Sequence, residues 1–596
     1  VIISGNKGNF HEIAVPGTHQ ASKFDQSTRG GALKLLWFRM NLHFKRMILW
    51  LLTINLASCG GREEVDLLIL NASVYTVDGD KPWAQALAIR DGLIVAVGAS
   101  DALIRDYEGE QLDLQGQMVL PGFHDSHSHL VYGGLELMRC DLSAESTVED
   151  LLQTIAACDD ALAAGEWLIA GGWDLSLFKS TNPSKSLLDD INPKRRMFIR
   201  GADGHSAWAS SAALDYAGIA AETPNPSDGI IERDASAEPR GVLRESAMML
   251  VEKVLPAVTV EDRLKAARIS VALAHSMGIT SVIDAATTES DAKAFDALDA
   301  DAALNLRLVL AMSLIAPFFD QAPLSSVKVS ERYSDQNVRR SSAKIFIDGV
   351  LEGETAALLS PYLVGNHGHG MLITPASALT EQVVALDAAG VQLMFHAIGD
   401  AGVRLALDAL EAAREANPAQ DLRHHISHLQ LVDPEDHPRF EALGVVANFQ
   451  ALWAFPDDYI MTINLPAVGL DRVQAMYPIG SLHRAGARIV GGSDWSVSSM
   501  NPLLAIETAL TRRDPTGVRP QALNAAEAVT LADMIEAYTI NGAYLAHREN
   551  QTGRLKPGYK ADLVVLGANL FELAPSEIGE VPIVMTLFEG QKVYPK

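Results

Sequence analysis

Side chains of the types that bind metal ions recur along the middle of this chain, at or just past the ends of short apolar runs. In chain order they are His127, His129, Lys344, His396, His428 and Asp494. Each apolar run reads as a buried β-strand. Two histidines separated by one residue are weak evidence alone. The ordered set at the ends of successive strands indicates a hydrolytic metal centre at the mouth of a (β/α)8 barrel.

The stretches between these side chains repeat one helix-to-strand joint. A segment with helical character closes at Gly278, Gly390, Gly444 or Gly486, and an apolar run of strand length follows each glycine. Glycine readily adopts the left-handed conformation that ends many helices. Repeated helix–glycine–strand units are typical of parallel βα repeats, so an α/β fold with a TIM barrel is expected over residues 119–544.

The two ends of the pattern are rich in strands instead. VDLLILNASVYTV and QALAIRDGLIVAVG lie near the start, KADLVVLGA and PIVMTLFEGQKVY lie near the end, and Asp91-Gly92 signals a hairpin turn. Neither end offers enough strands to bury a sheet face alone, so residues 59–118 and 545–596 are expected to form one small β-sandwich. Residues from about 142 to 256 exceed what one βα unit needs, and they predict an inserted lobe over the barrel mouth.

The first two histidines can bind the same ion. Alternate side chains of a strand point to one face, which places His127 and His129 together and turns Ser128 away. Imidazole nitrogens and carboxylate oxygens suit zinc and its first-row neighbours. His396 and His428 come from other strands and can hold a second ion.

The remaining two residues have distinct expected roles. Lys344 would repel a metal as an ammonium ion, but its carbamate, formed with carbon dioxide, is an anion that can bridge two ions. Asp494 can bind an ion and also move the proton of a water molecule whose pKa a metal lowers to about 7. The expected cofactor is therefore a divalent metal, zinc in the first instance, with one or two ions.

Further polar and aromatic residues are candidates for contact with a substrate. They are His205, Asp284, Glu352, Gln450 and Trp495. Alternatives stay open for two of them. His205 can be structural, and Asp284 can be a hydrogen-bond partner of a metal ligand or a helix cap.

Charge and cysteine content exclude several classes of protein. The formal net charge is −26, which argues against a nucleic-acid partner because phosphate binding needs clustered lysine and arginine. The only cysteines are Cys59, Cys140 and Cys158. Three cysteines exclude a disulfide scaffold and an all-cysteine zinc site.

Residues 40–58 have the features of a lipoprotein signal peptide. A basic Lys45-Arg46 pair precedes the apolar run ILWLLTINLAS, and Leu56-Ala57-Ser58-Cys59 resembles the site at which such peptides are cleaved and the cysteine is lipidated. The alternative is a short buried helix or strand with an unrelated cysteine. Residues 1–39 fit neither reading and are expected to be a non-native extension upstream of a start at Met40 or Met47.

These features predict a mature protein anchored through lipid on Cys59 in the cell envelope and facing the periplasm. The run is too short to span a bilayer. The residue after Cys59 is Gly60 and not aspartate, a pattern that resembles the signal for sorting to the outer membrane. No other contact with a membrane is expected, and homo-oligomeric assembly is left open.

Nearly the whole chain after Val65 resembles the amidohydrolase superfamily, and within it the amidohydrolase-3 branch of YtcJ-like and N-substituted formamide deformylase-like proteins. Stretches that carry the resemblance are LPGFHDSHSHL, KIFIDGVLEGETAALLSPY, FHAIGDAGVRLALDALE, LRHHISHLQLV and GSDWSVSSMNPLLAIETALTRR. The resemblance implies metal binding by the two pairs of histidines and by Asp494, and it carries over to Lys344 less securely. The chain departs from the usual pattern at His425, Ser427 and Ile283, which puts substrate preference in doubt more than activity.

The expected function is hydrolysis of an amide-type, non-peptide C–N bond of a small molecule by metal-activated water, with Asp494 as the catalytic acid–base. Ester or carbamate hydrolysis and deamination are alternatives at the same site. A lipoprotein that binds a ligand without turnover is the alternative of another class, and its signature would be a lost ligand. None of the expected ligands is lost.

Overall fold

The glycine joints end helices where the sequence predicts them. The computed structural model describes residues 62–178, 182–315, 324–365 and 368–595; the expected signal peptide and Cys59 lie outside them. Helix α8 (Val260–Ser276) gives way to β15 (Ile279–Thr287) through Gly278, which has a φ of 76°. Gly390, Gly444 and Gly486 also have positive φ angles, each a few residues before a strand.

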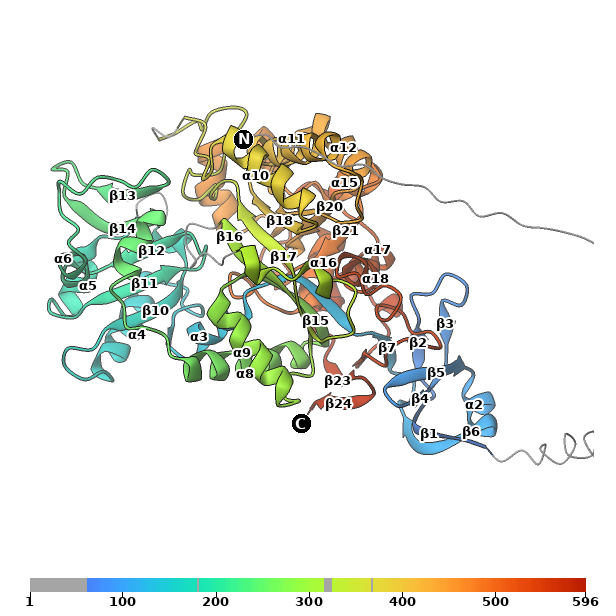
Figure 1. Ribbon diagram of the computed structural model, residues 1–596. Helices are drawn as coiled ribbons and strands as arrows, with labels where there is room; N and C mark the ends of the chain where they lie inside the picture. Colours follow the sequence, from blue (N-terminus) through green and yellow to red (C-terminus); the bar gives the residue numbers. More distant parts are fainter. Residues whose placement is uncertain (1–61, 179–181, 316–323, 366–367, 596) are drawn as a thin grey trace, which may run out of the picture. The chain divides into compact units, whose positions relative to one another are not determined.

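These strands form an eight-stranded sheet in which neighbours run parallel. Its order is β8 (Phe123–Ser128), β15, β16 (Arg307–Ile315), β17 (Val338–Phe346), β18 (Gln392–Ala397), β19 (His425–His428), β20 (Val446–Phe449) and β21 (Ile489–Gly491). A parallel bridge from Ser128 to Trp495 joins the last strand's loop to the first strand, so the sheet nearly closes. The predicted TIM barrel is confirmed (Figure 1).

Helices between these strands cover the outside of the barrel with apolar side chains. Helix α11 (Asp400–Ala416) is typical, because Val403, Leu407 and Leu410 are buried along its inner face. The other main helices are α9 (Glu289–Ala300), α10 (Ala376–Ala388), α12 (His437–Leu443), α15 (Ile479–Arg484), α16 (Pro502–Thr511), α17 (Leu531–Ala537) and α18 (Ile540–Leu545).

The two ends of the described chain meet in a β-sandwich. One sheet comes from the N-terminal side alone, in the order β5 (Leu93–Gly98), β4 (Ala86–Arg90), β1 (Glu63–Leu70) and β6 (Tyr107–Asp113). The Asp91-Gly92 hairpin signal is confirmed, since both residues have positive φ between β4 and β5. Helix α2 (Ser100–Asp106) connects β5 to β6.

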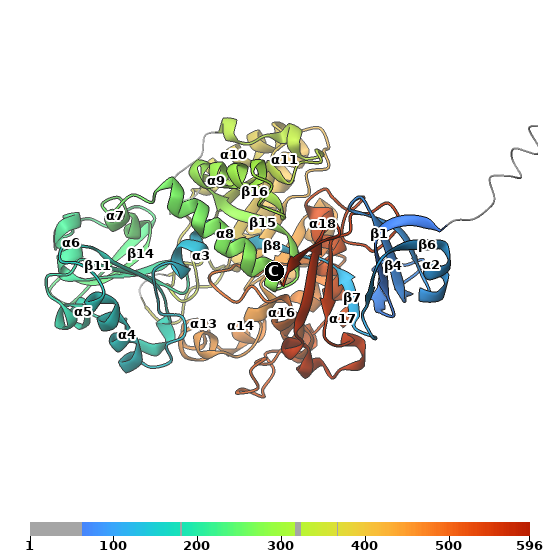
Figure 2. The same cartoon turned by 90° about the horizontal axis from the view of Figure 1, so that it is seen from below.

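The second sheet of the sandwich mixes both ends. Its order is β24 (Gln591–Tyr594), β23 (Ile583–Phe588), β22 (Leu563–Leu566), β7 (Met118–Pro121), β2 (Ser73–Tyr75) and β3 (Trp83–Ala84). Figure 2 shows the red C-terminal strands with the blue β7. Leu87, Val119 and Leu563 pack in the shared core. The sandwich extends to Pro121, beyond the expected limit at 118, because β7 needs four residues to pair with β22.

The inserted lobe has its own mixed six-stranded sheet. Its order is β13 (Gly229–Arg233), β14 (Pro239–Glu245), β12 (Ser206–Ala209), β11 (Met197–Gly201), β10 (Leu168–Trp173) and β9 (Cys140–Asp141). Its helices are α4 (Val148–Asp160), α5 (Lys185–Ile191), α6 (Ser211–Ala217) and α7 (Met249–Glu252). A disulfide between Cys140 and Cys158 joins β9 to α4, a bond that the cysteine count did not predict. Within the described ranges, no helix has the length and apolar character needed to cross a membrane.

Candidate metal centre

Three donor side chains converge where the last barrel strand meets the first. His127 is the second-last residue of β8, and His129 is the N-cap of the following helix, α3 (Leu130–Leu137). Asp494 lies in the loop after β21. The Nε2 atoms of both histidines lie 3.1 Å from Oδ1 of Asp494. The three residues therefore offer donor atoms within 4.8 Å of one another.

The backbone holds Asp494 in a conformation that few residues other than glycine adopt. Its φ is 53°, and its N–H donates to the carbonyl oxygen of His127 at 2.7 Å. The neighbouring Ser493 donates from Oγ to Oδ2 of Asp125 at 2.5 Å and from its N–H to Oδ1 at 2.9 Å. Asp125 thus ties the loop after β21 to strand β8, which fixes the carboxylate of Asp494 against the histidines.

The surroundings of the site keep His127 neutral and Asp494 charged. Loss of solvent, with Lys344 and His428 nearby, holds the pKa of His127 well below its ordinary value. Burial alone would raise the pKa of Asp494, but the hydrogen bond from His129 and the charges of His428 and Lys344 lower it. Neutral imidazole and ionised carboxylate are the protonation states that bind metals.

Lys344 lies inside this cluster on β17. Its side chain is 1% exposed, and its Nζ lies 3.0 Å from Nε2 of His127. Burial lowers the pKa of this amine to about 7, against a smaller opposing effect of Asp494. Burial therefore favours the uncharged amine of Lys344, which is the form that reacts with carbon dioxide.

His396 and His428 form the second half of the cluster. They come from β18 and β19, and their ring centroids are 4.5 Å apart. The ring of His428 also lies 4.8 Å from that of His127. Burial lowers the pKa of His428 to about 3 and that of His396 well below its usual value. Nε2 of His396 contacts the carbonyl oxygen of Gly349 at 3.2 Å.

The residues fit a divalent metal ion. Donors at about 2.0–2.1 Å from a tetrahedral ion lie roughly 3.3 Å apart, close to the 3.1 Å between Asp494 and each of His127 and His129. Within the described chain, neither ring nitrogen of His428 has a hydrogen-bond partner, although the side chain is 2% exposed. A buried imidazole without a partner is costly, and a bound ion would supply one.

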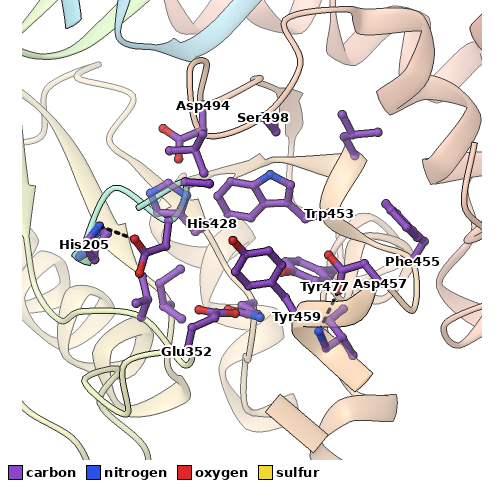
Figure 3. Close-up of a pocket in the computed structure, with 18 of the residues that line it drawn as sticks. His205, Glu352, His428, Trp453, Phe455, Asp457, Tyr459, Tyr477, Asp494 and Ser498 are labelled. Atoms are coloured by element: carbon purple, nitrogen blue, oxygen red, sulfur yellow. Dashed lines mark hydrogen bonds between the residues drawn. The ribbon is translucent and has the colours of Figure 1, made fainter. Parts of the chain in front are cut away.

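A cavity of about 390 Å³ opens beside these side chains. Figure 3 shows His205, Glu352, His428, Trp453 and Asp494 among its walls. The wall includes residues of the lobe, such as Asp203 and His205, and of the barrel loops. The lobe therefore closes one side of the cavity that the metal-binding side chains face.

The substrate-contact candidates divide into two groups. His205 and Glu352 line the cavity, whereas Asp284, Gln450 and Trp495 do not. Oδ1 of Asp284 accepts from the N–H of Leu130 at 2.8 Å and so supports the first turn of α3, next to His129. The Trp495 ring packs so tightly on Gly133 that an added Cβ there would lie 2.5 Å from it. Gln450 is buried beside Asn448.

Two acidic residues that support the site were missed from the sequence. Glu245, at the end of lobe strand β14, has a φ of 52° and places Oε2 2.8 Å from Nδ1 of His205. Asp348 accepts hydrogen bonds from the backbone N–H groups of Ala357, Ile398 and Gly399. Glu245 lies in the insertion, outside the repeat of barrel strand ends, so that pattern could not reveal it. Asp348 follows β17 by two residues and was overlooked in favour of Lys344.

The sequence matches the model of a family described as the amidohydrolase family over residues 110–594. Protein LONG AFTER FAR-RED 3 of Arabidopsis thaliana is 31% identical over 543 residues, which cover 89% of this chain and 92% of that protein. N-substituted formamide deformylase of Arthrobacter pascens is 28% identical over 551 residues, which cover 88% of this chain and 97% of that protein.

Solved structures show the same fold. A crystal structure titled as an uncharacterised metal-dependent hydrolase from Pyrococcus horikoshii superposes with a TM-score of 0.67 at 24% identity. It covers 86% of this chain, and the match includes 99% of that chain.

Proposed function

The chain belongs to the amidohydrolase family of metal-dependent hydrolases, and from that premise we propose that it cleaves an amide-type C–N bond, other than a peptide bond, in a small molecule. The observation that carries the proposal is the convergence of His127, His129 and Asp494 beside a cavity of about 390 Å³. A cavity of this size suits a small ligand. The name of the deformylase relative, which covers nearly the full length, supports a C–N bond as the target.

His127, His129 and Asp494 would hold one ion, and His396 with His428 would hold a second. We propose zinc, with Lys344 as a carbamate between the two positions. A divalent ion bound there supplies Lewis acidity, which lowers the pKa of water to about 7 and polarises a carbonyl group.

Asp494 is the proposed general base and acid. Its lowered pKa keeps it ionised at neutral pH, so its carboxylate can take a proton from water. The hydroxide oxygen that remains bonds to the carbonyl carbon, and the same carboxyl group returns the proton to the nitrogen as the C–N bond breaks, which releases a carboxylic acid and an amine. The hydrogen bond from its backbone to His127 keeps the carboxylate at the mouth of the barrel throughout.

His205 is the proposed orienting residue for the substrate. Burial would lower its pKa, but the carboxylate of Glu245, hydrogen-bonded to Nδ1, raises it above the ordinary value. A ring held in this way can present a proton to an oxygen atom in the cavity. Its ring centroid lies 4.9 Å from that of His396 on β18, so it stands beside the proposed metal centre.

We also propose that the protein is exported and anchored by lipid on Cys59. The signal-like sequence before Cys59 motivates the proposal, and the disulfide between Cys140 and Cys158 supports it. Disulfides persist in oxidising compartments such as the periplasm and are rare in the cytosol. Mass spectrometry of the N-terminus after expression from Met40, with Cys59→Ala as control, tests the anchor. An unprocessed cytosolic protein would refute it.

The decisive test of the reaction is a screen of purified, zinc-loaded protein against N-formyl amines, N-acyl amines, cyclic amides and their ester counterparts. We expect release of amine from at least one amide and loss of that release in Asp494→Asn. Hydrolysis of the esters alone would move the assignment to ester cleavage. Amide release by wild type that Asp494→Asn retains would remove Asp494 from the mechanism.

A further inference from the structure

Acidic and aromatic side chains line part of the cavity, alongside apolar residues and three histidines. Its carboxyl-bearing wall residues are Asp203, Glu352, Asp457, Asp494 and Asp514. None of the lining residues within the described chain is a lysine or an arginine. Carboxylates that lie outside the metal-binding cluster disfavour an anionic group beside them and favour a cationic one.

Glu352 and Asp457 each accept a hydrogen bond from a neutral group. Nδ2 of Asn464 donates to Glu352 at 2.8 Å, and the N–H of Ile460 donates to Asp457 at 2.8 Å. In the described part of the chain, no lysine or arginine forms a salt bridge with either carboxylate. Burial and, next, the charge of Glu352 raise the pKa of Asp457 to about 7. Two carboxyl groups that repel each other in one cavity are stabilised when a cation enters.

Aromatic rings surround these carboxylates. Trp453, Phe455, Tyr459 and Tyr477 line the same cavity, and Figure 3 shows Phe455, Tyr459 and Tyr477 near Asp457, with Trp453 next to His428. Trp453 also stacks on His428, with ring centroids 5.6 Å apart and planes 5° apart. The aromatic wall therefore continues directly into the proposed metal centre.

Tyr477 is one of the rings of this wall. Its side chain is 3% exposed in the folded chain, and it lines the cavity together with Asp457.

We infer that Glu352, Asp457 and the rings around them form a subsite for an ammonium group carried by the substrate. The inference rests on the proposed function, since it places the scissile amide at the metal centre and the cation farther along the cavity. Aromatic faces attract alkylated ammonium groups, and carboxylates pair with them. The substrate class is then an N-acyl amine that bears a second, positively charged nitrogen.

Two matched pairs of molecules test the subsite. Binding of choline and of its uncharged isostere 3,3-dimethyl-1-butanol is measured by calorimetry on the zinc-loaded protein. Hydrolysis is compared between N-formyl-2-(trimethylammonio)ethylamine and N-formyl-3,3-dimethylbutylamine. Each pair differs only by nitrogen in place of carbon, so any preference reports the charge. We expect a preference of at least about tenfold for the cation in both pairs.

Variants locate the preference. Glu352→Gln and Asp457→Asn, alone and together, should reduce it towards onefold, and Tyr477→Phe should reduce it less. Glu381→Gln, an exposed change on α10, is the control and should leave it intact. Retained zinc content would show that the metal centre is unchanged.

Equal binding of both isosteres to wild type, or a preference that the double variant keeps, overturns the inference. If choline binding is preferred but no amide is cleaved, the proposed reaction fails and the subsite stands. If both formamides are cleaved at equal rates, the reaction stands and the subsite fails.

Discussion

The sandwich core and the barrel mouth both consist of buried side chains, but the side chains in the two regions differ in chemical type. The sandwich core is filled by apolar side chains such as Leu87, Val119 and Leu563. At the barrel mouth, Lys344, His428 and Asp494 are at most 5% exposed, and their burial perturbs their pKa values. Apolar burial stabilises a fold, whereas burial of these polar groups costs free energy.

The difference indicates where stability and function reside. The chain positions Asp494 with a positive φ and leaves the nitrogens of His428 without a partner in the described residues, both of which are unfavourable for folding alone. Such features persist at functional sites. Changes in the sandwich should therefore alter stability and spare catalysis, and changes at the mouth should do the opposite.

The largest difference between the effect on catalysis and the effect on stability is expected for Asp494→Asn. Loss of the proton acceptor should lower kcat by about 10³-fold, within the range that general acid–base residues contribute. The free energy of unfolding of the metal-free protein should change by less than about 1 kcal/mol, since removal of a buried charge offsets the lost contacts. Initial rates and urea denaturation of the same preparation measure both. A large loss of stability would show that changes at the barrel mouth also affect the fold.

The next effect is expected for Lys344→Ala. Loss of the proposed carbamate should reduce activity about 10²-fold or more, as effects on metal ligation commonly do. Added short-chain carboxylates should restore part of the rate by taking the vacated position. Lys293→Ala on the exposed side of α9 is the control. Full activity of Lys344→Ala without any additive would show that no bridge is needed.

In the sandwich, Leu563→Ala should produce the reverse pattern. Leu563 is fully buried in β22, so its truncation should cost about 2–5 kcal/mol of unfolding free energy. The kcat of the folded fraction should equal that of wild type. Leu324→Ala, at a side chain 51% exposed, should cost far less. A drop in kcat at temperatures where Leu563→Ala remains folded would show that the sandwich and the barrel mouth are coupled.

The smallest combined effect on stability and catalysis is expected for a change in the lobe. Replacement of Cys140 and Cys158 by serine opens a loop of 18 residues and should cost up to about 3 kcal/mol. Limited proteolysis near α4 should become faster, while the rate constants for hydrolysis stay within about twofold, because neither cysteine lines the cavity. Reduction of wild type with dithiothreitol should reproduce the faster cleavage.

Local chemistry explains which parts of the fold were predictable. Glycine after each helix and a short apolar run after each glycine are signals within a few residues, so the barrel could be predicted. The donors at the ends of β8, β17, β18 and β19 followed from the same repeat. Parallel strands expose their carboxyl ends at one edge, which brings residues as distant as His127 and Lys344 within 3.0 Å.

Other features depend on contacts that no local pattern encodes. Glu245 reaches His205 only because β14 and β12 are paired in the lobe. Tyr459 and Tyr477 follow β20 and meet Glu352 from the loop after β17 only in the folded chain. Trp495 stands next to Asp494 in sequence, but its ring turns to Gly133 and away from the cavity. Two residues that are neighbours in the sequence of a loop can therefore face different parts of the structure.

The pairing of β7 with β22 has a consequence for how the chain is made. Met118 in β7 pairs with Leu566 in β22. Strand β7, which directly precedes β8, therefore cannot complete its pairing until a segment 448 residues later has been synthesised. Contacts of such long sequence separation form slowly and late. On the ribosome, β7 keeps an unpaired edge until almost the whole polypeptide has emerged. A chain interrupted before Leu563 would expose that edge to aggregation and to chaperones.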